Sequence, residues 1–289
     1  MTTTAQWIEG ARPKTLPAAL SPVLVGTGAA VAAGGARPVR ALLALLVALA
    51  LQIGVNYAND YSDGIRGTDA DRVGPLRLTG SGTTKPSLVL LAALVAFTVA
   101  SVAGLVLALL TSPLLLIVGL LALTAAWGYT GGKNHYGYRG LGEISVFVFF
   151  GLVAVIGTTY VQREDLTLLA LAGGIASGSL ACAILVTNNL RDIPTDTETG
   201  KQTLAVRLGD PKTRDLYTGL LVVPFAVAVL VALAYPGSLL ALLAVPLAVA
   251  PLRLVRSGAV GRDLVAVLQA TGKLQLAYGV LLGLGLALS

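Results

Sequence analysis

Long runs of apolar residues, with no polar residue on any face, constrain this chain more than any other feature of its sequence. Residues 41–51, for example, read ALLALLVALAL. A β-barrel strand alternates apolar with polar residues, whereas a helix surrounded by lipid and other helices is apolar all round. Hydrophobic residues make up 55% of the chain and charged residues 12%, against about 25% charged in an ordinary soluble domain. We therefore predict an all-α polytopic membrane protein.

The apolar segments predict the number of membrane spans. A helix needs about 20 apolar residues to cross the hydrocarbon layer, and nine segments approach that length. The fourth, eighth and ninth are short, which tilting or burial among neighbouring helices accommodates. We predict about nine transmembrane helices in a single domain, residues 1–289. The expected spans are residues 16–33, 41–57, 88–110, 114–129, 144–161, 166–189, 216–233, 239–254 and 274–288.

The distribution of charge predicts the orientation. If the nine spans alternate in direction, all 20 lysines and arginines lie on the N-terminal side of the membrane except Arg37, Arg40 and Arg163. An excess of Lys and Arg marks the cytoplasmic side, so we expect the N-terminus in the cytoplasm. Of the 14 acidic residues, only Glu164 and Asp165 lie on the other side. The positive-inside rule does not require acidic residues to gather on the cytoplasmic side, so we expect carboxylates to have a function on that face.

The first acidic cluster follows the second predicted span. Asn56, Asp60 and Asp63 are spaced i, i+4 and i+7, so they share one face if the helix continues beyond the span. Asn59 and Asp63 are also four residues apart. Gly67 then favours the end of the helix.

The second acidic cluster follows the sixth predicted span. Asn188, Asp192 and Asp196 are spaced i, i+4 and i+8. Pro194 argues against a regular helix as far as Asp196, so we expect Asp196 on a turn. The first cluster has a similar pattern, in which Asn59, Asp63 and a later Asp69 follow one another. We predict that the two clusters face each other across one cavity.

The residue types in these clusters favour magnesium and a diphosphate. With one cysteine and one histidine, the chain can form neither an internal disulfide nor a Cys/His zinc site, so any metal needs oxygen ligands. Mg²⁺ takes carboxylates, waters and substrate phosphate, and two clusters can hold two ions over one diphosphate. A single DxxxD is usually a solvated loop or a helix cap, but two such clusters with cations beside each argue for a site. The nearby cations are Arg66, Arg72, Arg77, Arg191 and Lys201.

The fourth and fifth predicted spans are joined by a loop rich in aromatic and basic residues. It contains Tyr129, Lys133, Tyr136 and Arg139. One interpretation is a lid that binds an aromatic or anionic substrate. The other is an interfacial aromatic belt, where Tyr and Trp commonly lie. The residues alone leave both open.

The sequence around the two clusters resembles the UbiA superfamily of intramembrane prenyltransferases. Members carry an NDxxDxxxD-type motif after the second span and a DxxxD motif after the sixth, which NDYSD (59–63) and DIPTD (192–196) match here. The third acid of the first motif falls at Gly67, and Asp69 follows two residues later. This shifted form resembles the 1,4-dihydroxy-2-naphthoate prenyltransferase branch, the MenA enzymes. Four longer strings resemble that branch as well: GARPKTLPAALSPVLVGTG, RVGPLRLTGSG, YGYRGLGEISVFVFFG and NNLRDIPTDTETGKQTLAVRLG.

The resemblance implies a UbiA-like bundle with cytoplasmic cap loops. It also implies transfer of a polyprenyl chain from a polyprenyl diphosphate to 1,4-dihydroxy-2-naphthoate. Diphosphate and CO₂ would leave, and demethylmenaquinol and then demethylmenaquinone would form. We expect the tail to lie between helices in contact with membrane lipid, tyrosines such as Tyr57, Tyr61 and Tyr129 to shield an allylic cation, and no nucleic-acid partner. The bias toward Ala, Gly, Leu and Val suggests a bacterial source and hence the cell (inner) membrane.

These interpretations assign each site residue an expected role. The catalytic acids are Asp60, Asp63, Asp192 and Asp196. The ligands of Mg²⁺ are Asn59, Asp60, Asp63, Asp69, Asp192 and Asp196. The substrate-binding residues are Asn56, Arg66, Tyr129, Lys133, Tyr136, Arg139, Asn188, Arg191 and Lys201.

Two alternative functions stay open at this point. The acceptor of a UbiA-type enzyme could instead be 4-hydroxybenzoate or a tetrapyrrole, which acceptor competition would distinguish. A transporter is the alternative of a different class. Transporters usually place polar groups near the middle of the membrane on broken helices, whereas the acids here gather at one rim, which argues against an ion path.

Overall fold

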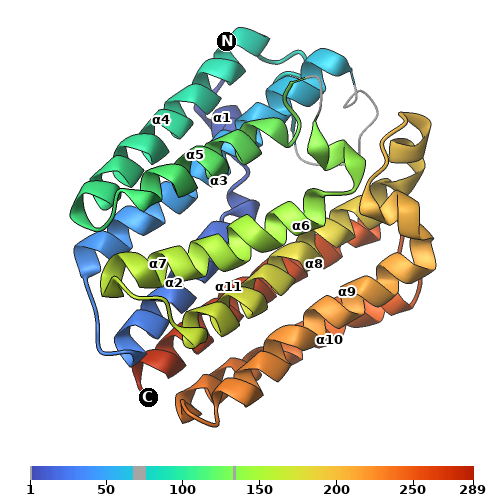
Figure 1. Cartoon of the computed structure of the whole chain (residues 1–289). Coiled ribbons are helices and arrows are strands. Elements are labelled where there is room, and N and C mark those ends of the chain that lie inside the picture. The colour runs from blue at the N-terminus through green and yellow to red at the C-terminus, as the bar shows by residue number, and fades with distance from the viewer. Residues whose placement is uncertain (1, 68–75, 133–134) are drawn as a thin grey trace.

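The computed structural model of this protein describes residues 2–67, 76–132 and 135–289. These residues form helices and connecting segments and contain no β-strand, which confirms the predicted all-α fold (Figure 1). The segments labelled η are short 3₁₀ helices, except η3, which is a π-helical stretch between α6 and α7. The elements are α1 (Thr4–Gly10), η1 (Pro13–Thr15), α2 (Pro17–Ala32), α3 (Pro38–Arg66), α4 (Pro86–Leu110), α5 (Leu114–Gly128), η2 (Tyr136–Arg139), α6 (Gly142–Val146), η3 (Phe147–Val153), α7 (Ala154–Arg163), α8 (Leu168–Glu198), α9 (Leu204–Val231), η4 (Pro236–Ala244), α10 (Val245–Arg256) and α11 (Arg262–Ala287).

Every predicted span coincides with a helical segment and extends at most two residues beyond it. Seven segments in the described part of the chain are each long and apolar enough to cross a membrane: α3, α4, the continuous α6–η3–α7 segment, α8, α9, the η4–α10 segment and α11. The helices before and after Leu16 form a pair bent by 49°, which makes an eighth span if the pair counts as one. The prediction of nine therefore holds only if α5, an apolar helix of 15 residues, is also counted.

Helix α8 lies at the centre of the bundle. In its most apolar window 72% of the residues are buried, more than in any other of the candidate spans. Helices α4 and α5 lie at one edge, and α9 and α10 lie at the opposite edge (Figure 1). Two fully buried tyrosines join α9 to α11, because Tyr217 shares a hydrogen bond of 2.8 Å with Thr271 and Tyr278 donates one of 2.6 Å to the carbonyl of Pro224.

The outer helices present large apolar side chains on the outside of the bundle. Leu109 on α4 is 79% exposed, and Leu120 on α5 and Leu230 on α9 are each 66% exposed. Contiguous apolar surface of this kind is unusual on a water-soluble monomer. These faces therefore fit a surrounding of lipid, in agreement with the predicted membrane protein.

Glycine allows the inner helices to pack with their backbones in contact. A Cβ atom placed on Gly28 of α2 would lie 2.2 Å from the carbonyl oxygen of Gly283 on α11. One placed on Gly151 of η3 would lie 2.5 Å from the Cα of Gly178 on α8. Small residues permit such close approach in membrane helices, and here they bring the cavity-lining segments against the central helix.

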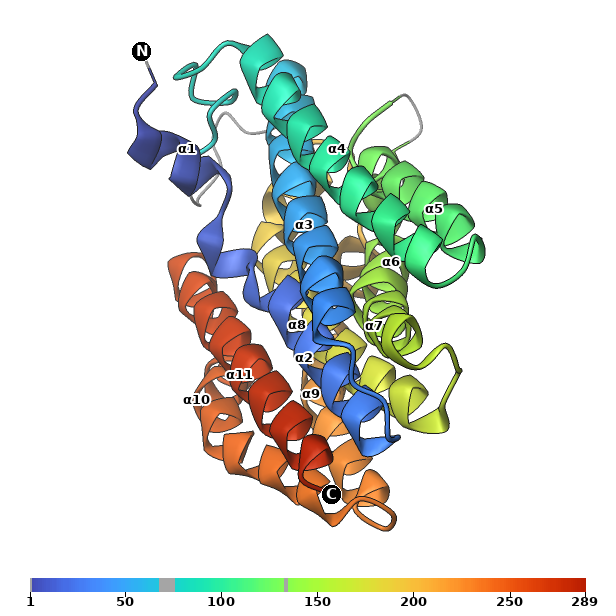
Figure 2. The same ribbon diagram turned by 90° about the vertical axis from the view of Figure 1, so that its left-hand side faces the viewer.

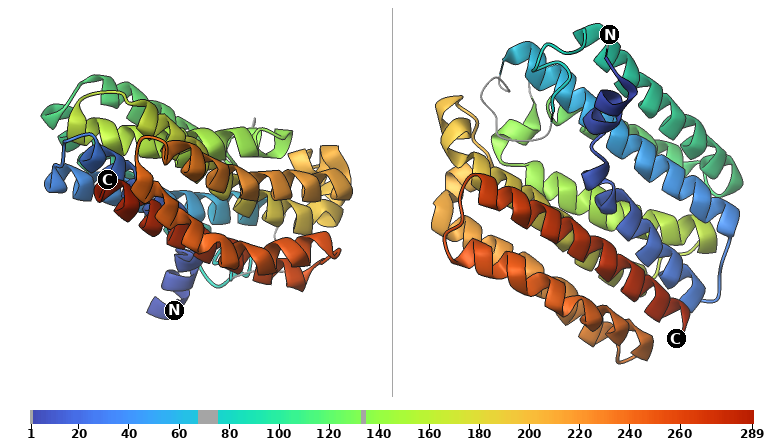
Figure 3. Two further views of the ribbon diagram at one scale, coloured as in Figure 1. Left: turned by 90° about the horizontal axis from the view of Figure 1, so that it is seen from below. Right: turned by 180° about the vertical axis from the view of Figure 1, so that it is seen from behind.

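The chain before α2 bends twice and lies along the side of the bundle. Figures 2 and 3 show α1 projecting away from the other helices. A capping box between Thr3 and Gln6 begins this short helix. Arg12 then adopts left-handed backbone angles, with φ of 55°, and Pro13 opens η1. The first predicted span begins at residue 16, so these elements were not predicted.

Helix α3 continues beyond the predicted span, as the spacing of its polar residues indicates. The span was expected to end at Tyr57, but the helix reaches Arg66 and carries Asn59 and Asp63 on its last turns. Gly67 ends it with φ of 73°, a left-handed conformation that glycine adopts without strain. The prediction that this glycine ends the helix is confirmed.

Helix α8 also continues beyond its predicted span, and here one prediction was wrong. Asp196 was expected on a turn because of Pro194, yet the helix passes through both residues to Glu198. The fixed φ of proline suits a helix, and its cost lies in the lost N–H and a clash one turn back. The threonine hydroxyls of this last turn donate hydrogen bonds of 2.7 to 3.1 Å to the carbonyls of Asp192, Ile193 and Thr195, which helps to hold the helix together. The donors are Thr195, Thr197 and Thr199.

Candidate active site

A cavity of about 1030 Å³ opens between the helices, and both predicted clusters line it. Its size is at the upper end of the range for small-molecule sites. The last turns of α3 and α8 supply one polar end, while aliphatic and aromatic side chains line the remainder. The polar residues include Asn56, Asn59, Asp63, Arg77, Asn188, Arg191, Asp192, Asp196 and Lys201. The apolar residues include Leu51, Leu115, Val118, Phe149, Phe150 and Val153.

Asp63 is the carboxylate of α3 that lies in this cavity. It is 6% exposed. The hydroxyl of Tyr138 donates to its Oδ1 at 2.7 Å, and Nη2 of Arg77 lies 3.7 Å from its Oδ2. Asn59 lies one turn earlier, where its Oδ1 accepts a hydrogen bond of 2.6 Å from the hydroxyl of Thr130. A buried carboxylate requires such charged and polar partners, so this turn is electrostatically compensated.

Asp60, a predicted metal ligand, does not line the cavity. It is fully buried, and its two oxygens accept the backbone N–H groups of Leu78 at 2.7 Å and Thr79 at 2.9 Å. In an α-helix Asp60 is rotated by about 100° from Asn59, which directs it toward the segment before α4. The structure therefore gives Asp60 a different surrounding from the one that the motif predicted.

The polar face of α8 follows the predicted spacing. Arg191 binds Asp192 with two hydrogen bonds, from Nε at 2.6 Å and from Nη2 at 2.7 Å. The same Nη2 donates to Oδ1 of Asn188 at 2.9 Å. One arginine thus holds two of the three predicted residues of this helix, and all of them line the cavity.

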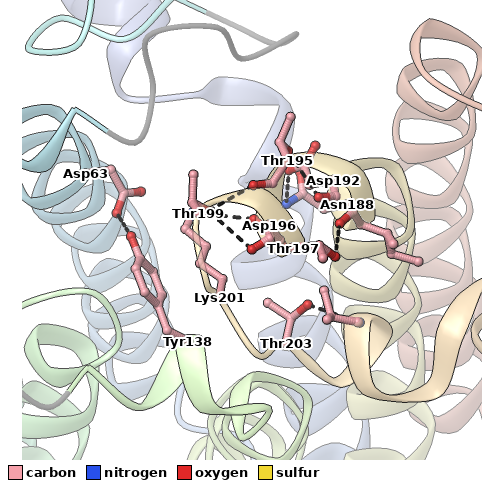
Figure 4. A network of polar contacts seen from close by, with 12 residues as sticks. Asp63, Tyr138, Asn188, Asp192, Thr195, Asp196, Thr197, Thr199, Lys201 and Thr203 are labelled. Carbon is pink, nitrogen blue, oxygen red and sulfur yellow. Dashed lines mark hydrogen bonds and ion pairs between the residues drawn. The ribbon is translucent and has the colours of Figure 1, made fainter.

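Two further residues connect the clusters. Nζ of Lys201 lies 3.6 Å from Oδ1 of Asp196 and 4.5 Å from the centre of the Tyr138 ring. The Tyr138 hydroxyl in turn reaches Asp63, so a chain of contacts runs from α3 to α8 (Figure 4). The two clusters therefore face each other across the cavity, as the sequence predicted, with Tyr138 and Lys201 between them.

Three more predicted residues line the cavity. Asn56 donates to the carbonyl of Ala11 at 2.9 Å and to Thr15 at 3.0 Å, which ties the N-terminal segment to α3. Tyr129 and Tyr136 pack edge to face with ring centres 5.6 Å apart. Burial raises the pKa of Tyr136 above its usual value, so its hydroxyl is a hydrogen-bond donor at neutral pH.

Besides Asp60, two predicted residues lie outside the cavity, and two lie outside the described residues. Arg66 and Arg139 line a separate outer pocket. Arg66 donates hydrogen bonds there to backbone carbonyls, including that of Gly132 at 2.7 Å. The diphosphate role predicted for Arg66 therefore has no support in its position. Asp69 and Lys133 are not among the residues that the structure describes, and the same holds for the nearby cation Arg72.

Sequence reasoning missed several residues of the site. All three tyrosines of this loop were candidates for the acceptor site, but only Tyr129 and Tyr136 were assigned to it, because so short a segment has no periodicity that shows which side chains point inward. Arg12 and Lys14 also line the cavity, although the N-terminal segment was not assigned to it. The one available indication was GARPKTLPA, the string that contains both residues.

The chemistry of these donors fits Mg²⁺ completed by a substrate. No group of three or more His, Cys, Asp or Glu side chains in the described part of the chain converges to hold a metal alone. The cavity instead carries carboxylate and amide oxygens on two separate helices, which are hard ligands. Mg²⁺ usually binds one or two carboxylates and fills its remaining positions with water and phosphate, so the donors suit a metal that arrives with a diphosphate.

Comparison with known proteins agrees with the fold and the site. The family model described as the UbiA prenyltransferase family matches residues 19–282. The chain is 54% identical over 280 residues to the 1,4-dihydroxy-2-naphthoate octaprenyltransferase of Mycobacterium tuberculosis, covering 97% of this chain and 96% of that one.

Two solved structures share the fold at low sequence identity. The apo structure of a UbiA homolog from Aeropyrum pernix has a TM-score of 0.70 at 15% identity and covers 93% of this chain and 96% of its own. A UbiA homolog from Archaeoglobus fulgidus bound to GPP and Mg²⁺ has a TM-score of 0.68 at 14% identity, covering 96% and 99%. With the family match over most of the chain, these findings lead to one conclusion: the chain belongs to the UbiA prenyltransferase family.

Proposed function

We propose that this protein transfers a polyprenyl chain from a polyprenyl diphosphate to 1,4-dihydroxy-2-naphthoate. The observation that carries the proposal is the 54% identity, over nearly the full length of both chains, to a protein with that named activity. The cavity supports it, because clustered carboxylates and cations adjoin a long apolar space. We propose that the whole chain acts as one domain.

The polar end of the cavity is suited to a diphosphate. Arg77, Arg191 and Lys201 line it and are each paired with a carboxylate, at Asp63, Asp192 and Asp196 respectively. Positioned cations of this kind stabilise the charge that develops on a leaving group. The apolar side chains of α3, α5 and η3 then provide a path for the polyprenyl tail, which lies between helices next to lipid.

The α3 pair Asn59 and Asp63 and the α8 pair Asp192 and Asp196 would hold the metal. Two Mg²⁺ ions, one at each pair, would suit a single diphosphate. When bound, the metal supplies positive charge to the diphosphate oxygens as the bond to carbon breaks. Asp60 holds the segment before α4 in place and is not part of this ligand set.

The reaction takes place at C1 of the donor, the carbon that is bonded to the diphosphate. The C1–O bond of the allylic diphosphate breaks, and its electron pair leaves with the diphosphate. The electron-rich ring carbon of the naphthoate bonds to C1, CO₂ leaves that carbon, and demethylmenaquinol forms, which oxidation converts to demethylmenaquinone. The walls contributed by Tyr129, Phe149 and Phe150 exclude water from the allylic cation and favour its charge.

The same proposal includes the location of the protein. We infer a bacterial cell membrane, with the N-terminus and the polar end of the cavity on the cytoplasmic side. The excess of Lys and Arg on that side supports this orientation. Both soluble products of the reaction, diphosphate and CO₂, would then be released into the cytoplasm.

The test is an assay of the purified protein in detergent with 1,4-dihydroxy-2-naphthoate and a polyprenyl diphosphate. We expect mass spectrometry to detect the prenylated, decarboxylated quinone with Mg²⁺ and not with EDTA. Transfer to 4-hydroxybenzoate or to a tetrapyrrole, without transfer to naphthoate, would retain the family and contradict the acceptor. Flux of substrate across liposomes without any covalent product would instead support a transporter.

A further inference from the structure

Tyr138 separates two spaces of different character. Of the residues that the structure describes, Tyr138 alone lines both the reaction cavity and the outer pocket. The outer pocket has a volume of about 700 Å³ and is polar. It is lined by Arg66, His135, Tyr138, Arg139, Thr199, Gly200, Gln202 and Arg207. The charged and polar side chains of this pocket suit water, whereas aliphatic and aromatic side chains line most of the reaction cavity.

Contacts on several sides hold the Tyr138 ring between these spaces. Its hydroxyl is bound to Asp63 on α3, and its face lies under the ammonium of Lys201. Its backbone carbonyl accepts the N–H of Gln202 at 2.9 Å. The ring of His135 packs against its edge with centres 4.2 Å apart. The ring is thus fixed by α3, by the segment between α8 and α9, and by its own loop (Figure 4).

The position of the ring places it beside the reacting carbon. This step rests on the proposed function, in which the diphosphate binds between Asp63 and Asp196. Tyr138 contacts the first of these carboxylates directly and the second through Lys201. The C1–O bond of the donor therefore breaks next to the Tyr138 ring.

Water at this position would compete with the aromatic acceptor. In transfer, the naphthoate ring carbon bonds to C1 and the diphosphate takes the electron pair of the broken bond. In the competing reaction, a water oxygen bonds to C1, loses a proton to solvent, and yields a polyprenol and diphosphate. Exclusion of water is a general means of preventing hydrolysis of reactive intermediates, and an allylic cation is such an intermediate.

We propose that Tyr138 is the partition that keeps water of the outer pocket from the allylic carbon. Its ring provides the barrier, and its hydroxyl bond to Asp63 holds the ring in place. The residue acts on the choice between two products, in addition to any effect on rate. Loss of the ring joins the two spaces, and the donor is then consumed partly as polyprenol.

The experiment measures how the donor is divided between polyprenol and prenylated quinone. Purified protein receives Mg²⁺, polyprenyl diphosphate and naphthoate, and mass spectrometry gives the ratio of polyprenol to prenylated quinone. We expect Tyr138→Ala to raise the ratio several-fold over the unaltered protein and Tyr138→Phe, which keeps the ring, to leave it near the original value. Reaction in H₂¹⁸O should place the label in the polyprenol, because water oxygen bonds to C1 in the competing reaction.

Gln202→Ala provides the matched control. Gln202 lines the outer pocket and not the cavity, and its backbone N–H, which the substitution keeps, donates to the carbonyl of Tyr138. Its side chain is exposed, so we expect this variant to keep both the product ratio and the rate. A melting temperature equal to that of the unaltered protein shows that each variant is folded.

Two results would overturn the inference. One is an unchanged product ratio in Tyr138→Ala while transfer is still measurable. The other is a folded Tyr138→Ala and a folded Tyr138→Leu that consume no donor at all, because the side chain would then act in ionisation and not as a partition. Failure of the proposed function would give a different result, because the unaltered protein itself would then make no prenylated quinone.

Discussion

The carboxylate of Asp60 accepts the backbone N–H of Leu78 at 2.7 Å in the buried interior, although 18 residues separate the two along the chain. The second oxygen accepts the N–H of Thr79 at 2.9 Å. Both donors would be left without a partner in Asp60→Ala. A buried unsatisfied group costs about 1–3 kcal/mol, so we expect a clearly lowered melting temperature in detergent. Asp60→Asn keeps one acceptor oxygen and should lose less; a melting temperature unchanged in both variants would contradict this role.

Asp63 and Asp192 should show the opposite behaviour. Both line the cavity and carry the charge that a metal requires, whereas asparagine keeps the size of the side chain and removes the charge. We expect Asp63→Asn and Asp192→Asn to abolish turnover while each protein still inserts and purifies. Activity near the original level in either variant would rule out a metal site built from both helices.

The contrast between Asp60 and Asp63 shows what the sequence could and could not predict. Helical spacing correctly placed Asn59 and Asp63 on one face of α3 and Asn188 and Asp192 on one face of α8, because a helix has a fixed period of 3.6 residues. It also grouped Asp60 with Asn56 and Asp63, of which only the last two line the cavity, while Asp196 was expected on a turn and lies in the helix. The same period leaves Asp60 at the edge of the polar face. Whether Asp60 faces the cavity depends on the segment before α4. The contact between that segment and Asp60 is set by tertiary packing.

Two other differences have local causes. The rule that proline ends a helix failed at Pro194, where the fixed φ of proline is compatible with the helix and threonine hydroxyls of the same turn bind backbone carbonyls. Tyr138 lies in a 3₁₀ helix of only four residues, which is too short for a sequence period to show which side chains point inward. The inward residue is defined by contacts with Asp63 and Lys201, which come from distant parts of the sequence. Aromatic composition could identify the loop as a candidate lid, but it could not select the residue.

Lys201 should affect binding of the donor more than folding. Its ammonium lies 3.6 Å from Asp196 at the polar end of the cavity. A hydrogen bond to a charged group contributes about 1.5–3 kcal/mol, and every 1.4 kcal/mol is about tenfold in affinity. We therefore expect Lys201→Gln to raise the KM for polyprenyl diphosphate about tenfold or more, with the KM for naphthoate little changed. Equal effects on both substrates would contradict a specific diphosphate role.

Glu164 provides a pH-dependent contribution to stability far from the site. It binds Arg37 and, at 2.7 Å, Arg40, at the start of α3, whereas Asp63 lies near the other end of that helix. Hydrogen bonds from Arg40 and Arg37 hold the pKa of Glu164 below its ordinary value of 4.5. Because the folded-state pKa is depressed, this contribution is present above the ordinary value and is lost as pH falls through the folded one.

The measurement for Glu164 is the melting temperature as a function of pH. We expect Glu164→Gln to melt below the unaltered protein at pH 7, and the difference to shrink as the medium is acidified below the ordinary carboxyl pKa. Prenyl transfer at pH 7 should be unaffected. A difference in melting temperature that is constant over the whole pH range would show that the charge of Glu164 is not its cause.

Gly119 on α5 should determine how long a polyprenyl tail the cavity accepts. It lines the apolar part of the cavity, and a Cβ placed on it would meet no atom within 4 Å. Phenylalanine at this position would therefore enter the space proposed for the tail without displacing a neighbouring helix. We expect Gly119→Phe to lose activity with long donors such as octaprenyl diphosphate and to keep it with geranyl diphosphate. Gly219 on α9 is equally open but does not line the cavity, so Gly219→Phe should leave both donors unaffected. If Gly119→Phe instead slowed short and long donors alike, the tail would have to follow another path between the helices.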